Sequence, residues 1–393
     1  MIEAKEFSER RNRLQEEIKE LGLDAFLISQ PESIYYYTGA TYKPQERPFL
    51  ITIWPQRDPT FLVPKLEKDH IHKANIGDVK SYWEFPSPPG EGWPEKLDEI
   101  LQGVKTLGIE QGISLENQSC LKVKKLKPLD IVNRQRHIKT PAEIKMIRQS
   151  ASYADKLMAM MLKNAYYGVS VLEMFGLGRK IQMEVIKSGE FDPLNCEFLS
   201  ATWPSRFSHM PHGVPPLDGK LTNGPLAFMS YLRVNGYASE NERTVFLTKP
   251  TEREKDVFNH MRAARQKAFD IIKPGVPCAE VDKAALGYLR KQGYGEFLLH
   301  RTGHGIGQGN HEGPWVADGS EHILEENMVI SVEPGIYIPD LGGFRHSDTV
   351  LVTKDGYEVL TKGSTEIEDL TLLKPKFMKR IIGRLIQKAL NIA

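Results

Sequence analysis

The stretch HRTGHGIGQGNHEGP, residues 300–314, is the most informative segment of this 393-residue chain. It places His300, His304 and His311 among several glycines. A buried imidazole needs a polar partner and glycine weakens helices and strands, so such a run is unusual for a structural core. We therefore interpret it as a functional loop, with turn-capping histidines as the structural alternative.

The composition is that of an ordinary globular protein, with 40% hydrophobic and 26% charged residues. The length favours two domains. A formal net charge of +1 argues against a nucleic-acid partner, which requires a clear basic excess. Three cysteines without a CxxC pair argue against a disulfide framework or a zinc knuckle. We expect no transmembrane segment and a cytoplasmic location, because the N-terminus is a charged amphipathic stretch and no apolar run approaches about 18 residues.

The N-terminal part alternates apolar runs with charged stretches typical of helices. The predicted strands are LDAFLIS (23–29), PFLITIWP (48–55) and PTFLVP (59–64). Such alternation indicates an α/β domain, which we place at residues 1–138.

A long helix is predicted to open the second domain. Thr140 suits the N-cap, Pro141 the first turn, and Glu143 completes the spacing of a capping box. Further helices and mainly antiparallel strands follow, which predicts an α+β layer structure over residues 139–372.

The remaining residues, 373–393, form a basic amphipathic segment with six Lys or Arg and no acid. Phe377, Ile381, Leu385 and Ile386 follow helical spacing. The segment is either a helix on a membrane surface, or a terminal helix docked on its own domain or on a subunit partner.

Four motifs in a fixed order resemble the M24 superfamily of methionine aminopeptidase, aminopeptidase P, prolidase and creatinase. They are GHGIG, HEGP, SVEPGIYIP and GGFRHSDTVLVT, and the N-terminal YYYTG resembles the creatinase/prolidase N-domain. The resemblance implies a pita-bread catalytic domain preceded by an α/β creatinase-type N-terminal domain, usually in a homodimer.

The metallopeptidases of this superfamily hold two metal ions with five ligands. The resemblance places these ligands at Met229, Glu240, His304, Glu333 and Ser347. A thioether and a hydroxyl do not replace hard carboxylate ligands, so we predict that no two-metal cluster forms and that no cofactor is needed. The alternative is a single divalent ion held by Glu240, His304 and Glu333.

The loss of carboxylate ligands at Met229 and Ser347 favours a metal-independent hydrolase of C–N bonds in a small compound that carries a carboxylate. This pattern resembles creatinase and ectoine hydrolase. His212 lies 17 residues before Met229, where the family places its catalytic histidine, and Glu242 matches the creatinase ERT segment. The predicted catalytic residues are His212, Glu242, His304 and Glu333. The predicted substrate-binding residues are Arg47, Glu240, His300 and His311.

Two other functions remain open from the sequence. One is an Xaa-Pro aminopeptidase or dipeptidase with at most one divalent metal, and the other is a non-catalytic binding member of the superfamily.

Residues two apart on a strand share a face, so Glu240 and Glu242 are expected to point into one pocket and Asn241 away from it. Two neighbouring carboxyl groups raise the pKa of one of them.

Overall fold

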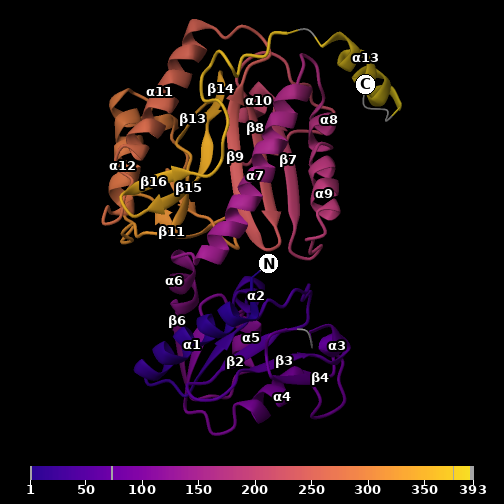
Figure 1. Ribbon diagram of the computed structural model, residues 1–393, viewed down its shortest axis with the longest axis vertical. Helices are drawn as coiled ribbons and strands as arrows, with labels where there is room; N and C mark the ends of the chain where they lie inside the picture. The colour runs from indigo at the N-terminus through magenta and orange to yellow at the C-terminus, as the bar shows by residue number, and fades with distance from the viewer. Residues whose placement is uncertain (1, 72–73, 375, 390–393) are drawn as a thin grey trace. The chain divides into compact units, whose positions relative to one another are not determined.

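The structure, a computed structural model, describes residues 2–71, 74–374 and 376–389. The chain divides into two compact units, Met1–Arg136 and His137–Ala393. The division falls two residues before the end of the predicted N-terminal domain. Figure 1 shows the elements of each unit.

The first unit is built on a six-stranded mixed sheet with the order β4-β3-β2-β1-β5-β6. Its strands are β1 (Ala25–Ile28), β2 (Leu50–Ile53), β3 (Thr60–Pro64), β4 (Asp78–Tyr82), β5 (Thr106–Glu110) and β6 (Lys125–Leu129). Its helices are α1 (Ala4–Glu20), α2 (Pro31–Thr38), η1 (Lys65–Glu67), α3 (Lys68–Ile71), α4 (Trp93–Ile100), α5 (Leu115–Ser119) and α6 (Ile131–His137).

The central strand β1 is apolar throughout because both faces of the sheet are covered. Phe26 and Ile28 belong to the core on one face. Ala25 and Leu27 belong to a separate core on the other face. Side chains alternate between the faces of a strand, so the continuous run AFLI fills two cores at once.

The second unit is built on a larger antiparallel sheet with the order β11-β10-β12-β15-β9-β8-β7, with β16 paired to β15 and a separate β13–β14 pair. Its strands are β7 (Glu197–Trp203), β8 (Leu226–Val234), β9 (Tyr237–Val245), β10 (Gly303–Gly305), β11 (Glu312–Val316), β12 (Val329–Val332), β13 (Gly335–Ile338), β14 (Gly342–Arg345), β15 (Ser347–Thr353) and β16 (Gly356–Val359).

Helices flank this sheet, and in Figure 1 α7 crosses β8 and β9. They are α7 (Pro141–Asn164), α8 (Val171–Phe175), α9 (Gly178–Lys187), α10 (Ser205–Ser208), α11 (Glu252–Phe269), α12 (Cys278–Lys291), η2 (Gly295–Phe297) and α13 (Phe377–Ala389). The α7 helix begins with the predicted capping box, in which Thr140 and Glu143 each accept a hydrogen bond from the other's backbone N–H.

The register of three neighbouring strands positions the site. β8 and β9 form a hairpin whose turn, Asn235–Gly236, has positive φ at both residues, as a type I′ turn requires. Glu242 of β9 consequently lies opposite Met229 of β8 on one side and Ser347 of β15 on the other.

The chain's last described element is α13. Residues 390–393 of the predicted C-terminal segment lie outside the described residues. Among the residues that the structure describes, no helix combines the length and apolar character needed to cross a bilayer.

Candidate active site

A cavity of about 490 Å³ in the second unit gathers most of the predicted site residues. Six of them line it, namely His212, Glu240, Glu242, His300, His311 and Glu333. His304 is buried beside this wall, within 3.0 Å of Glu333. Segments far apart in the sequence therefore meet at one place.

The two glutamates of β9 both face this cavity, as the strand period predicts. Glu240 is 3% exposed and Glu242 is 4% exposed, which excludes a solvated edge strand. The side chain of Asn241 points to the other side, where it donates to Asp155 at 2.9 Å and to the carbonyl oxygen of Lys362 at 2.9 Å. The alternation separates the face of β9 that lines the cavity from the face that makes buried hydrogen bonds.

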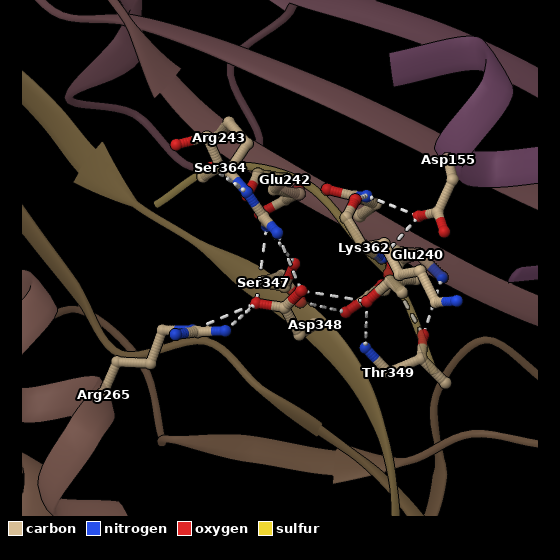
Figure 2. Close-up of polar contacts among 12 residues, drawn as sticks. Asp155, Glu240, Glu242, Arg243, Arg265, Ser347, Asp348, Thr349, Lys362 and Ser364 are labelled. Atoms are coloured by element: carbon tan, nitrogen blue, oxygen red, sulfur yellow. Dashed lines mark hydrogen bonds and ion pairs between the residues drawn. The ribbon is translucent and has the colours of Figure 1, made fainter. Parts of the chain in front are cut away.

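A buried ion-pair network holds β9 against β15 behind the cavity (Figure 2). Asp348 is fully buried and contacts Arg243 at 2.9 Å and Arg265 on α11. The burial of Asp348 opposes its ionisation, but the two guanidinium groups outweigh this and lower its pKa. The Thr349 hydroxyl adds a hydrogen bond of 3.0 Å to the carbonyl oxygen of Glu240. These contacts fix the register that places Ser347 beside Glu240.

The glycines around His304 are required by close backbone approach. A Cβ at Gly303 would lie 2.0 Å from the carbonyl oxygen of Ser331, and one at Gly305 would lie 2.0 Å from that of Gly313. The short strand β10 therefore fits between β11 and β12 only without side chains at these two positions.

His304 is oriented as a metal ligand. Its Nδ1 lies 3.1 Å from the carbonyl oxygen of Gly305, to which it donates, so that in the neutral ring Nε2 carries the lone pair that a metal ion requires. Nε2 is buried, 3.0 Å from Glu333 and 3.8 Å from Glu240, and is not aligned for a hydrogen bond. One ligand atom from each of these three residues lies within 4.8 Å of the other two. This group fits one divalent ion.

The charges in the cluster are strongly coupled. Burial disfavours the imidazolium of His304, but the adjacent carboxylates of Glu333 and Glu240 outweigh it and raise its pKa to about 9. Burial opposes ionisation of Glu333, yet His304 and Arg345 lower the pKa of that carboxyl. The pocket is thus organised to hold positive charge between carboxylates.

Burial also raises the pKa of Glu242, to about 8, against the opposing effect of Arg345. Glu333 and Glu240 add to the increase because they are further acids in the same pocket. Burial likewise raises the pKa of Glu240, so the neighbouring carboxyl groups add to an effect that burial dominates.

Met229 and Ser347 stand next to this cluster without extending its set of anionic ligands. Met229 lines the cavity opposite Glu242. The Ser347 hydroxyl donates to Glu240 at 2.8 Å. Neither side chain supplies a negative oxygen, so the donor set suits one ion rather than two.

Arg345 is a site residue that sequence reasoning missed. It lines the cavity, donates to Glu242 at 2.7 Å, and lies 3.8 Å from Glu333. Its position in GGFRHSD, two residues before Ser347, was the available signal. Trp203, Pro211, Leu299, Arg301 and Asn310 also line the cavity, and of these Arg301 and Asn310 lie in the histidine-rich stretch 300–314.

The remaining predicted histidines differ in environment. His212 is exposed at the cavity wall. His300 is held by the carbonyl oxygen of Arg301 and the Tyr337 hydroxyl, each at 2.7 Å, and burial lowers its pKa. The ring of His311 lies 3.9 Å from that of His304, and burial together with that neighbour lowers the pKa of His311 to about 4.

Arg47 lies in the first unit, on the loop before β2, where it makes an ion pair with Glu84 at 2.5 Å. The other predicted site residues belong to the second unit. Its role in substrate binding stays a prediction.

An antiparallel sheet flanked by helices, with a pocket of histidines and carboxylates on one face, defines the pita-bread class of hydrolases. The sequence profile of metallopeptidase family M24 matches residues 145–354, and that of the creatinase/prolidase N-terminal domain matches residues 10–138. The chain belongs to metallopeptidase family M24. The predicted superfamily and the predicted fold, a pita-bread domain preceded by a creatinase-type N-terminal domain, are confirmed. The prediction that the protein is a hydrolase is also confirmed.

Individual relatives agree with this assignment. The chain is 30% identical to the Xaa-Pro dipeptidase of Pyrococcus furiosus, over 91% of this chain and 99% of the relative. It is 31% identical to the Xaa-Pro dipeptidase of Lactobacillus delbrueckii subsp. lactis, over 91% of this chain and 98% of the relative. The crystal structure of the prolidase from Pyrococcus horikoshii OT3 superposes with a TM-score of 0.78 at 30% identity, covering 91% of this chain and 99% of that one.

The prediction of a metal-independent hydrolase resembling creatinase is wrong. Relatives that match nearly the whole chain are Xaa-Pro dipeptidases, and the matching family is one of metallopeptidases. The expectation that no cofactor is needed is likewise unsupported. The loss of carboxylates at Met229 and Ser347 does not exclude metal binding, because three protein ligands suffice for one catalytic ion.

Proposed function

We propose that the chain is an Xaa-Pro dipeptidase that acts with one divalent metal ion. The cluster of Glu240, His304 and Glu333 carries this proposal, because its ligand atoms lie within 4.8 Å of one another beside a substrate-sized cavity. The similarity to Xaa-Pro dipeptidases supports the choice of substrate.

The ion would be held by Glu240, His304 and Glu333. A divalent ion at this cluster supplies Lewis acidity, which polarises a peptide carbonyl group. The chain's own contribution is to keep His304 in the correct tautomer through the carbonyl oxygen of Gly305, and to keep Glu240 in place through Ser347.

The cavity offers a separate group for each part of a dipeptide. Glu242 is a buried carboxyl suited to the α-ammonium group, and Arg301 at the wall suits the terminal carboxylate. Trp203 and Leu299 give an apolar surface for the proline ring. His212 accepts a proton from the attacking water and returns it to the leaving proline nitrogen.

The metal content and the peptidase activity test this proposal together. Purified protein is analysed for bound metal and assayed on Xaa-Pro dipeptides before and after chelation, with Mn²⁺, Co²⁺ or Zn²⁺ added back. We expect one ion per chain, loss of hydrolysis on chelation, and recovery with metal. Hydrolysis that survives complete removal of metal, or two ions per chain, contradicts the proposal.

Variants separate metal binding from proton transfer. His212→Ala should lower kcat by about 10²–10⁴-fold while leaving the metal content at one ion. Glu333→Gln should lose both metal and activity. The exposed Glu326→Gln in the same unit is the matched control and should behave as the parent protein.

We further propose a cytoplasmic homodimer. Val214 and Leu299, which are 90% and 57% exposed, lie near His212 and at the cavity wall, where a second copy would cover them. Light scattering of the purified protein should give twice the chain mass. A Val214→Asp variant should weaken the dimer, and a monomeric parent protein contradicts the proposal.

A further inference from the structure

The C-terminal helix α13 rests on the second unit through its polar side. Gly383 is buried, and a Cβ there would lie 1.8 Å from the Tyr166 hydroxyl oxygen. Gln387 is 6% exposed and donates to Glu173 at 2.6 Å. A surface helix normally exposes its polar face, but α13 packs its polar face against the second unit.

Two lysines secure the start of this helix. Lys376 donates to the carbonyl oxygens of Leu162 and Ala165, at 3.0 and 2.7 Å, at the C-terminal end of α7. Lys379 donates to the carbonyl oxygen of Lys163 at 2.7 Å. Cations at the C-terminal end of a helix satisfy its free carbonyl groups and its dipole, so these contacts set the orientation of α13.

The opposite side of α13 is apolar and exposed. Its exposed apolar residues are Phe377, Met378, Ile381 and Leu385, with exposed fractions between 40% and 72%, and Ile382 at their margin is 51% exposed but also lines a cavity beside the docked Gly383. They share one face, because their spacing follows the helical repeat. An ordinary surface helix has the reverse arrangement, with its apolar side against the core. Figure 1 shows α13 at the edge of its unit, beyond α8.

The positive charge of residues 373–393 indicates which kind of partner binds the exposed apolar face of α13. Six of the chain's 52 lysines and arginines lie in residues 373–393, and none of its 51 acids does. Lys374, Arg380 and Lys388 are exposed. Symmetric pairing with a second copy would bring two such basic segments together without compensating acids, which is unfavourable. An anionic lipid surface offers both an apolar layer and the opposite charge.

We propose that α13 binds the protein peripherally to membranes that contain anionic lipids. The apolar face enters the boundary between headgroups and acyl chains, and the flanking lysines and arginines contact the headgroups. The helix lies outside both family matches, which end at residues 138 and 354, so the activity is expected not to require it.

Vesicle co-sedimentation of the full-length protein tests the proposal. Vesicles of phosphatidylcholine with 30% phosphatidylserine are compared with vesicles of phosphatidylcholine alone, at low and high salt. We expect binding to the anionic vesicles only, weakened by salt. No binding to anionic vesicles by folded protein overturns the proposal.

Variants distinguish insertion from simple charge attraction. Ile381→Asp and Leu385→Asp should each weaken vesicle binding about tenfold or more, because each removes a buried apolar side chain from the lipid. Arg380→Glu with Lys388→Glu should have a similar effect. The control is Leu115→Asp, an equally polarising change at an 83% exposed residue of the first unit, which should bind normally.

Two further outcomes would refute the proposal. Vesicle binding that is lost with Arg380→Glu plus Lys388→Glu but unchanged in Ile381→Asp and Leu385→Asp shows charge attraction without insertion. A parent dimer that Leu385→Asp converts to a monomer shows that a second copy covers the face. Peptidase activity should be unchanged in all these variants, which keeps this test separate from that of the proposed function.

Discussion

Removing the carboxylate of Asp348 should destabilise the second unit more than any surface change. Asp348→Ala leaves the guanidinium groups of Arg243 and Arg265 without their shared anion. Loss of one partner of a buried ion pair costs about 3–5 kcal/mol. Arg243 is 2% exposed but keeps carbonyl acceptors, among them those of Glu242 and Ser347.

The expected cost therefore lies in the lower part of that range, at about 3–4 kcal/mol. Arg265 is 12% exposed and can turn toward water, which reduces the loss on its side. The corresponding decrease in the folding equilibrium constant is about 10²–10³-fold. The change should also loosen the pairing of β9 with β15 and so weaken metal binding at Glu240.

Hydrogen exchange of peptides from β9 and β15 measures this effect in the second unit alone. Both strands should lose protection by the stated factor in Asp348→Ala. Asp256→Ala, at a 65% exposed side chain of the same unit, is the control and should change protection little. A cost below about 1 kcal/mol in Asp348→Ala would show that the ion pairs do not hold the register.

Three other changes test separate parts of the site. Gly303→Ala should prevent normal folding, seen as loss of soluble protein or a large fall in Tm, whereas Gly356→Ala, with open space around it, should be tolerated. Metal at 100 times its Kd should stabilise the parent protein by about 2.7 kcal/mol and raise its Tm, and Glu333→Gln should show no such rise. Lys139→Met removes the 3.0 Å ion pair between buried Lys139 and buried Glu312 and should cost about 3 kcal/mol in urea unfolding, and adding Glu312→Gln should recover part of the loss.

Much of the architecture could be predicted because local rules and tertiary structure agree. The capping box at Thr140 marks the start of α7, and the apolar run before Gln30 contains β1. The alternation of Glu240, Asn241 and Glu242 follows directly from strand geometry.

The function could not be predicted from the number of metal ligands that the sequence retains. The sequence shows that Met229 and Ser347 are poor ligands, but not that the remaining three ligand atoms converge within 4.8 Å. Arg345 was missed for the same reason, since its contact with Glu242 depends on how β14 approaches β9. Such convergence depends on three-dimensional packing and leaves no periodic pattern in the sequence.

The bare backbone on either side of His304 also bears on how selectivity can be changed. A mutagenesis library that randomises residues 303 and 305 would consist largely of misfolded proteins, because neighbouring carbonyl oxygens already occupy the space of any side chain. Trp203, Leu299 and Asn310 line the same cavity outside that short strand. New substrate preferences should therefore be sought by diversifying these three residues, with the histidine strand left constant.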